Sequence, residues 1–128
     1  MLPPADTNDS GRSDPYFYLL DSAENLESAF AAGSLVRDDL KNEGFIHASP
    51  ADQLTRVANK FYRQVINLRC AVVEKAKVRS EVKYEPATGG LYPHIYGPLN
   101  MDAVARLIEL TPNAEGHYEI DPAQLMNL

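Results

Sequence analysis

The spacing of apolar residues changes along this chain, and this change constrains the fold more than any other feature of the sequence. In the first half, residues 26–30 and 54–61 place apolar side chains three and four positions apart, on one face of a helix. In the second half, short apolar runs separated by turn residues are typical of strands. The resulting order is strand, helix, strand, helix and then three to five strands. It predicts an α+β fold with two early helices and a late antiparallel sheet.

The first half of the folded unit is predicted to alternate strands and helices. We expect a strand at residues 16–20, a helix after Asp21 or Ser22, a loop at 35–43, a strand at 45–48 and a helix from Pro50 to residues 62–64. Asp21 and Glu24 stand in a capping-box pattern, and Gly33 is a natural C-terminal stop for the first helix.

The second half is predicted to consist mainly of strands. We expect strands at residues 69–75, 81–85 and 94–99, a turn-rich loop at 86–93 of a kind that often shapes a site, and an edge strand at 117–120. Residues 100–110 are ambiguous. Met101, Val104 and Leu107 suit a helix, whereas the alternation of residues 104–110 suits a strand.

Length and composition predict one domain that does not enter a membrane. Its 128 residues divide into a disordered N-terminal leader at 1–15, a globular domain at 16–120 and a C-terminal tail at 121–128, which is either loosely held or a short last turn of helix. The leader is not a signal peptide, and no apolar stretch approaches the roughly 20 residues that cross a bilayer. Cys70, the single cysteine, lies in an apolar run and is predicted to be a buried thiol. We therefore expect a soluble, cytoplasmic protein of undefined oligomeric state.

The net charge excludes one class of partner. A formal charge of -6 argues against nucleic-acid binding, which relies on a basic surface. It leaves room for a small anionic ligand, because a local pocket can be positive on an acidic protein. Basic residues of the helices and loops, Arg37 and Arg56 among them, are interpreted as mostly solvated surface charges.

His47 lies in the first of two patterns that could carry chemistry. Phe45, His47 and Ser49 share one face of their strand because side chains alternate. The apolar Phe45 on that face weakens a catalytic interpretation. Ser49 has a structural explanation as the N-cap of the helix that follows, with Pro50 in the first helical position. A histidine at the end of a strand is, by itself, more often a hydrogen-bonded structural residue.

The second pattern places His94 between two tyrosines. Tyr92, His94 and Tyr96 share one face of their strand and follow the Gly89-Gly90 loop. An imidazole between two phenols suits a ligand platform that stacks on a ring or donates hydrogen bonds to sugar hydroxyls or phosphate. Cross-strand packing explains the same pattern equally well.

Other signals are weaker. Glu85, at the end of a strand before a proline, is either a solvated acid or the carboxylate of a site. His47, His94 and Glu85 could together form a two-histidine, one-carboxylate metal site, but their sequence spacing does not support it and no metal is expected. Sequence motifs for phosphate loops, dinucleotide binding, serine hydrolases and zinc peptidases are missing. His117 is expected to be solvated.

Several motifs in order resemble the family called domain of unknown function 952. They are residues 44–49 (GFIHAS), Phe61-Tyr62, Glu85 and residues 93–99 (PHIYGPL). The resemblance covers residues 16–110, and its paired motifs are specific. Two departures are Tyr84, where the family commonly has tryptophan, and the leader before Tyr16.

The resemblance implies an ADP-ribosyltransferase-like fold, a split antiparallel β-structure whose active members hold NAD in a central cleft. By this analogy His47 would hold a ribose hydroxyl, with Ser49 beside it. His94 and Tyr96 would line the nicotinamide side, and Glu85 would be the available carboxylate for a ribosyl cation. The analogy is one between folds, and function depends on the site itself.

Two functional hypotheses of different classes follow. The first is a protein that binds or acts on NAD or a related phosphorylated nucleotide in a cleft with two histidines. As an enzyme it would cleave NAD or transfer an ADP-ribosyl or phosphoryl group. The alternative is a non-catalytic domain that binds a small ligand or a protein partner. NAD is the one cofactor suggested. The catalytic candidates are His47, His94 and Glu85, and the ligand-binding candidates are Ser49, Tyr92, Tyr96, Gly89 and Gly90.

Overall fold

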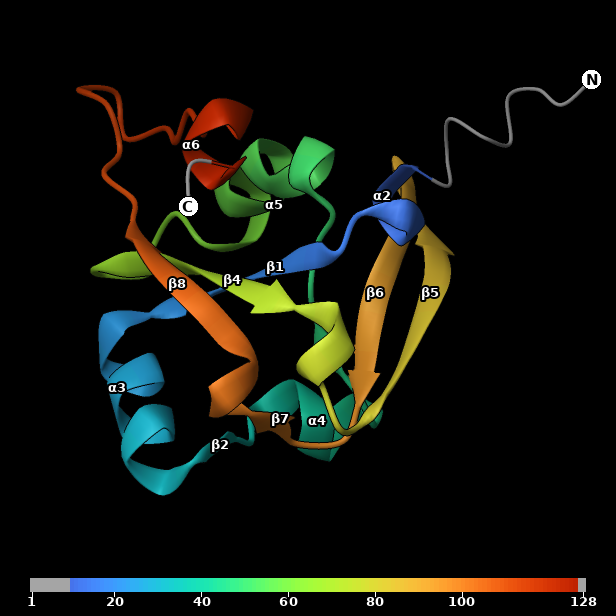
Figure 1. The fold of residues 1–128 in the computed structure, drawn as a ribbon. Coiled ribbons are helices and arrows are strands. Elements are labelled where there is room, and N and C mark those ends of the chain that lie inside the picture. Colours follow the sequence, from blue (N-terminus) through green and yellow to red (C-terminus); the bar gives the residue numbers. More distant parts are fainter. Residues whose placement is uncertain (1–9, 127–128) are drawn as a thin grey trace, which may run out of the picture.

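Two antiparallel sheets form the framework of the structure, a computed structural model that describes residues 10–126 (Figure 1). The first sheet has the order β1-β4-β8, from β1 (Tyr16–Ser22), β4 (Leu68–Glu74) and β8 (Val104–Glu109). The second has the order β3-β6-β5, from β3 (Ile46–His47), β6 (Gly90–Tyr96) and β5 (Glu81–Ala87). A two-stranded pair joins β2 (Ser34–Leu35) to β7 (Leu99–Asn100). The predicted α+β class with antiparallel strands is confirmed.

Helices cover both faces of the β1-β4-β8 sheet (Figure 1). The α-helices are α2 (Ser10–Ser13), α3 (Ala23–Ala32), α4 (Asp38–Glu43), α5 (Leu54–Phe61) and α6 (Pro122–Met126). Short 3-10 turns are η1 (Ala51–Gln53), η2 (Lys75–Lys77) and η3 (Met101–Ala103). In Figure 1, α5 and α6 lie on one side of the sheet and α3 lies on the other.

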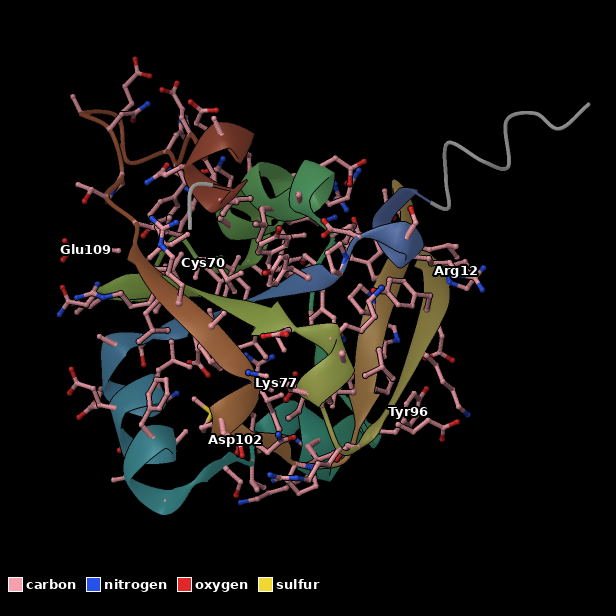
Figure 2. The ribbon with its side chains drawn as sticks, in the orientation of Figure 1. Arg12, Cys70, Lys77, Tyr96, Asp102 and Glu109 are labelled. Atoms are coloured by element: carbon pink, nitrogen blue, oxygen red, sulfur yellow. The ribbon has the colours of Figure 1, made fainter. Side chains whose placement is uncertain are left out.

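The β1-β4-β8 sheet, called the central sheet below, is apolar on both faces. This explains the continuous apolar runs in the sequence of its strands. In β1, Phe17 and Leu19 pack into the cluster that contains α3 residues, whereas Tyr18 and Leu20 pack into the cluster that contains α5 and α6 residues. This alternation is the period of two expected for a strand. Cys70 on β4 is buried as predicted (labelled in Figure 2), and burial raises the pKa of its thiol to about 12.

Local signals fix the ends of α3 as predicted. Ser22, one of the two residues predicted as its cap, accepts a hydrogen bond from the backbone N–H of Asn25 at 3.1 Å. Gly33 ends the helix with a positive φ of 88°, a conformation that glycine adopts without a steric penalty.

The predicted loop at residues 35–43 is wrong, because this segment contains the end of β2 and the helix α4. Acidic residues in the first turn of α4, Asp38 and Asp39, suit the positive end of a helix, and Gly44 closes it with a φ of 91°. The helix has no buried residue and hence no apolar stripe, so hydrophobic periodicity carries no signal for it.

The predicted N-cap role of Ser49 is also wrong. The helix begins one residue later than expected, as the turn η1, and Pro50 precedes it without a side-chain cap. Ser49 instead forms an isolated antiparallel bridge with Tyr18 of β1. The N–H of Tyr18 donates to the carbonyl of Ser49 at 2.9 Å, and the reverse bond is 2.7 Å. This bridge ties the segment after β3 to the central sheet.

In the second half, the predicted loop at residues 86–93 is mostly strand, because β5 extends to Ala87 and β6 starts at Gly90. The ambiguous segment at 100–110 forms η3 and then the strand β8. The predicted edge strand at 117–120 is wrong. The backbone of residues 117–120 is bound by side chains of α5 instead of by a strand. Asn59 accepts a hydrogen bond from the N–H of Tyr118 at 2.7 Å, and Thr55 accepts one from the N–H of Ile120 at 3.1 Å.

Both described chain ends contain a short helix, and for the C-terminal tail this is one of the two predicted alternatives. Residues 1–9 of the predicted leader lie outside the described residues, and Ser10–Ser13 form α2. In the predicted tail, α6 buries Leu125 in the cluster beside α5. Within residues 10–126, no helix has the length and apolarity needed to cross a membrane.

Candidate functional site

His47 and His94 lie side by side on the wall of one cleft. They are register partners in the β3–β6 pair, and their ring centroids are 5.4 Å apart with one ring edge facing the other. The cleft has a volume of about 1150 Å³ and is lined by residues of α3, α4, α5 and β6 and of the segments around β2 and β3. The pairing of β3 with β6 thus brings together two histidines that are 47 positions apart in the sequence.

Asp39, at the start of α4, holds His47 at two points. Its Oδ2 accepts the backbone N–H of His47 at 2.9 Å and lies 3.0 Å from ring atom Nδ1. Arg37 donates to the same carboxylate from Nε at 3.1 Å and from Nη2 at 2.6 Å. Burial favours the neutral acid, but the hydrogen bonds from His47 and Arg37 outweigh it and hold the pKa of Asp39 well below its usual range. The carboxylate beside His47 is therefore ionised.

Arg37 joins three elements around the cleft. Its Nη1 donates to the carbonyl of Leu20 at 2.9 Å and lies 3.4 Å from Oδ2 of Asp21, at the end of β1. Its Nη2 also donates to the carbonyl of His47 at 3.3 Å. Burial opposes the charged guanidinium, but the bond to Asp39 raises the pKa of Arg37 above its ordinary value. The interpretation of Arg37 as a solvated charge is wrong, because its side chain is only 12% exposed.

A second carboxylate holds His94. Nδ1 of His94 lies 2.7 Å from Oε1 of Glu85, and the hydroxyl of Tyr96 donates to the same oxygen at 2.5 Å. Phe45 stacks on the His94 ring with a centroid distance of 4.1 Å and an interplanar angle of 17°. The bonds from Tyr96 and His94 lower the pKa of Glu85, and the bond to Glu85 raises that of Tyr96. Figure 2 labels Tyr96 at the β5–β6 hairpin.

Arg56 of α5 and Tyr92 of β6 form the third group at the cleft. Arg56 donates from Nη2 to the carbonyl of Thr88 at 2.7 Å and to the hydroxyl of Tyr92, and from Nε to Gln53 at 3.0 Å. All these partners are neutral. In the described part of the chain, neither Arg56 nor Lys60, which also lines the cleft, pairs with a carboxylate. The interpretation of Arg56 as a solvated charge misses these contacts.

Ser49 lines the cleft with its hydroxyl unused. The residue is 5% exposed, and its side chain makes no hydrogen bond to another residue within 10–126.

The two glycines predicted as ligand-binding residues do not line the cleft. Gly89 and Gly90 form the β5–β6 turn outside the cleft lining, and Gln53 donates to the carbonyl of Gly89 at 3.3 Å. They shape the hairpin rather than contact the cavity.

The structure therefore divides the predicted site residues into three groups. His47, His94, Ser49 and Tyr92 line the cleft, Glu85 and Tyr96 lie behind His94, and the two glycines shape the turn. Sequence reasoning missed Asp39 altogether. A carboxylate two residues after an arginine, shortly before the GFIH motif, was the one signal for it. His117 is exposed, as expected.

Among the residues described, no three His, Cys, Asp or Glu side chains are arranged to hold a metal ion. His47, His94 and Glu85 do not form the open ligand set that the sequence pattern suggested as an alternative. Glu85 binds His94 directly.

Comparisons with known proteins give a family and a set of similar structures. The family described as "Protein of unknown function (DUF952)" matches residues 20–107. The crystal structure of protein CC0527 from Caulobacter crescentus is similar with a TM-score of 0.76 and 31% identity, covering 87% of this chain and 98% of that one. The solution NMR structure of CC0527 is similar with a TM-score of 0.68 and 32% identity, covering 81% and 91%. No curated protein matches.

Proposed function

The chain belongs to the protein family of unknown function DUF952, and within it we propose that the cleft binds NAD or a related phosphorylated nucleotide. The observation that carries the proposal is the pair His47 and His94, held side by side on one wall of the cleft. Imidazoles fixed by carboxylates are suited to bind ribose hydroxyls or phosphate oxygens, because their ring atoms are already oriented when the ligand arrives.

The size and lining of the cleft support a nucleotide. Its volume of about 1150 Å³ slightly exceeds the roughly 300–1,000 Å³ that is typical for small-molecule sites, so the cleft has room for a nucleotide. One part of the lining is apolar, with Ala29, Val36, Val57 and Phe61. Other lining residues are polar and include the two histidines and the hydroxyls of Ser49 and Tyr92. A flat ring joined to a polar sugar phosphate has the same division.

Two cations favour a phosphate. Arg56 and Lys60 line the cleft without a carboxylate partner among the residues described, whereas Arg37 is neutralised by Asp39 and Asp21. The charge of Arg56 is thus available to an anion, even though the protein as a whole has a formal charge of -6. A guanidinium is well suited to phosphate because its planar donors match pairs of oxygens.

The proposal extends to the fold and to residue roles by analogy with ADP-ribosyltransferases. Two three-stranded antiparallel sheets linked at Tyr18 and Ser49 support the split β-structure. In this assignment His47 binds a ribose hydroxyl with Ser49 beside it, and His94 lies toward the nicotinamide. Glu85 acts through His94, because its carboxylate is bound to that ring and does not line the cleft.

The test is a titration of the protein with NAD, AMP and nicotinamide mononucleotide, followed by NMR of the histidine rings. We expect shifts at His47 and His94 but not at the exposed His117. Arg56→Gln should weaken binding at least about tenfold, since a hydrogen bond to a charged group contributes about 1.5–3 kcal/mol. Arg63→Gln is the matched control, because Arg63 is exposed outside the cleft lining and donates to the carbonyl of Gly116.

A nicotinamide assay on the same samples separates binding from chemistry. Release of nicotinamide from NAD identifies an NAD-cleaving enzyme. Ring shifts without release contradict NAD cleavage and leave nucleotide binding standing. No shift with any of the three nucleotides contradicts the proposal.

A further inference from the structure

Each cleft histidine is held by a carboxylate at the same ring atom. Nδ1 of His47 lies 3.0 Å from Oδ2 of Asp39, and Nδ1 of His94 lies 2.7 Å from Oε1 of Glu85. An ionised carboxylate can only accept a hydrogen bond, so the proton is on Nδ1 in both rings. In the neutral ring this leaves Nε2 as the atom that accepts or returns a proton.

Both Nε2 atoms are left for a ligand. In the described chain, no hydrogen bond joins Nε2 of His47 or His94 to another residue. Oε1 of Glu43 lies 3.7 Å from Nε2 of His47, which is too far to accept a hydrogen bond. Both rings line the cleft with centroids 5.4 Å apart, so hydrogen bonds of about 2.7–3.0 Å can reach two oxygens on one phosphorus.

The two rings differ in their access to water. The side chain of His47 is 45% exposed, whereas that of His94 is 11% exposed and is covered by the stacked ring of Phe45. Water therefore reaches His47 more easily, which suits a general base. His94, which water reaches less easily, is then left as the general acid, and the Glu85 carboxylate beside it stabilises the protonated ring.

NAD cleavage does not need such a pair. Nicotinamide leaves NAD as a neutral molecule, so no proton has to be donated to it. A phosphodiester differs, because its leaving group is an alkoxide that needs a proton while the attacking water has to lose one. Two oriented histidines therefore fit a phosphodiester better than they fit a glycosidic bond to nicotinamide.

We propose that the Asp39–His47 and Glu85–His94 pairs form the acid–base machinery for hydrolysis of a small nucleotide phosphodiester, with a nucleoside 2′,3′-cyclic phosphate as the probe substrate. This rests on the proposed binding of a phosphorylated nucleotide in the cleft. The strained five-membered ring of such a phosphate is opened by acid–base catalysis. Arg56 and Lys60 bind its non-bridging oxygens.

The reaction step balances without a further reactant. The oxygen of one water molecule bonds to phosphorus, and the proton that it loses moves to Nε2 of His47. The bond from phosphorus to one ribose oxygen breaks, and that oxygen takes the Nε2 proton of the His94 imidazolium. The product is the nucleoside 2′- or 3′-phosphate. Afterwards His47 releases a proton to solvent and His94 takes one up, which returns both rings to their starting state.

The test measures hydrolysis of the four nucleoside 2′,3′-cyclic phosphates by ³¹P NMR. Wild type should open the ring, and His47→Gln and His94→Gln should each lower kcat at least about 100-fold, within the range for general acid–base groups. The matched control is His117→Gln, which changes an exposed histidine outside the cleft. Thermal unfolding shows that each variant keeps its fold.

Asp39 and Glu85 are positioning residues in this proposal, and their variants give an independent readout. Asp39→Asn and Glu85→Gln should lower kcat more than they change KM, because the amide no longer fixes the ring tautomer. A purely structural role would lower activity only in proportion to the amount of folded protein, so kcat is calculated per folded molecule, which thermal unfolding quantifies. Equal activity of the wild type and both histidine variants would overturn the proposal.

The outcomes for the two proposals are separable. Ring shifts with NAD or AMP, together with no opening of any cyclic phosphate, contradict the acid–base pair and leave nucleotide binding standing. No ring shift with any nucleotide, cyclic phosphates included, contradicts both. Ring opening that falls in the histidine variants supports both.

Discussion

One carboxylate oxygen, Oδ2 of Asp39, binds His47 through both its backbone N–H, at 2.9 Å, and its ring Nδ1, at 3.0 Å. A single contact would leave the ring free to rotate about its side-chain bonds. Two contacts from one atom fix the strand end and the ring together. Because Arg37 holds the same carboxylate, the orientation of the His47 ring depends on a residue that contacts only the backbone of His47.

Replacing Asp39 by asparagine is expected to lower the free energy of unfolding at pH 7 by about 1.5–3 kcal/mol, the range for hydrogen bonds to charged groups. Although burial favours the neutral acid, the bonds from His47 and Arg37 hold the pKa of Asp39 in the folded state below its unfolded value of about 4. The stabilisation is therefore complete above about pH 4 and is lost as the pH falls toward the folded pKa. Urea unfolding at pH 7 and pH 3 measures it.

The difference between wild type and Asp39→Asn should be smaller at pH 3 than at pH 7. Asp38→Asn is the matched control, because Asp38 is its exposed neighbour in the same first turn. It should change the stability much less. An equal acid dependence in wild type and Asp39→Asn would show that this carboxylate is not the group that titrates.

Replacing Arg37 by glutamine is expected to be the most destabilising change at the cleft. Its guanidinium is 12% exposed and pairs with Asp39 and Asp21, so its loss leaves two carboxylates without their cation. Breaking a buried pair in this way costs about 3–5 kcal/mol. Guanidinium chloride unfolding measures the loss.

The control for Arg37→Gln is Arg79→Gln, which breaks an exposed pair. Arg79 lies 2.7 Å from Asp102, but both side chains are more than half exposed, and exposed ion pairs contribute little. A similar loss in both variants would contradict the distinction between the buried and the exposed pair.

The elements that the sequence predicts well are those whose signals are local. The strand β1 is apolar on both faces, and α3 begins at a serine cap and ends at a glycine with a positive φ. The helix α4 was missed because it buries no residue and so has no stripe. A tertiary contact holds the start of α4 in place: Arg37, just before the helix, donates to the carbonyl of Leu20, which lies 17 positions earlier in the sequence.

The candidate site was predicted only in part for the same reason. The alternation of side chains placed His47 and His94 on definite strand faces, but their register across β3 and β6 follows from the fold. The sequence favours Arg56 as a mostly solvated charge, because nothing in the helix pattern distinguishes a polar face over a cleft from one in solvent. Asp39 was missed because it lies in the unpredicted helix.

Replacing Ser49 by alanine should leave the free energy of unfolding unchanged within about 0.5 kcal/mol, the usual range for a change that removes no contact. Its hydroxyl has no hydrogen-bond partner among the described residues, and its backbone bonds to Tyr18 are kept. Ser22→Ala is the contrast, because Ser22 caps α3 and its loss should cost about 1 kcal/mol. Thermal unfolding compares them. A cap-sized loss in Ser49→Ala would restore the capping role that the sequence suggested.

Replacing Tyr96 by phenylalanine should raise the pKa of Glu85 toward its ordinary value. The hydroxyl of Tyr96 donates to Oε1 of Glu85 at 2.5 Å, and this bond is the main reason why the pKa of that carboxyl is lowered. His94 remains as its second partner, so part of the shift should persist. Titration of the Glu85 carboxyl by ¹³C NMR measures the change.

Tyr84→Phe is the control for Tyr96→Phe, since it removes a hydroxyl from the neighbouring position on β5. The Tyr84 hydroxyl is buried without a hydrogen-bond partner among the described residues, so its removal should leave the pKa of Glu85 unchanged. It should also leave the protein at least as stable, because an unsatisfied buried polar group is destabilising. If both variants shift Glu85 equally, the cause is a change in the hairpin rather than the bond from Tyr96.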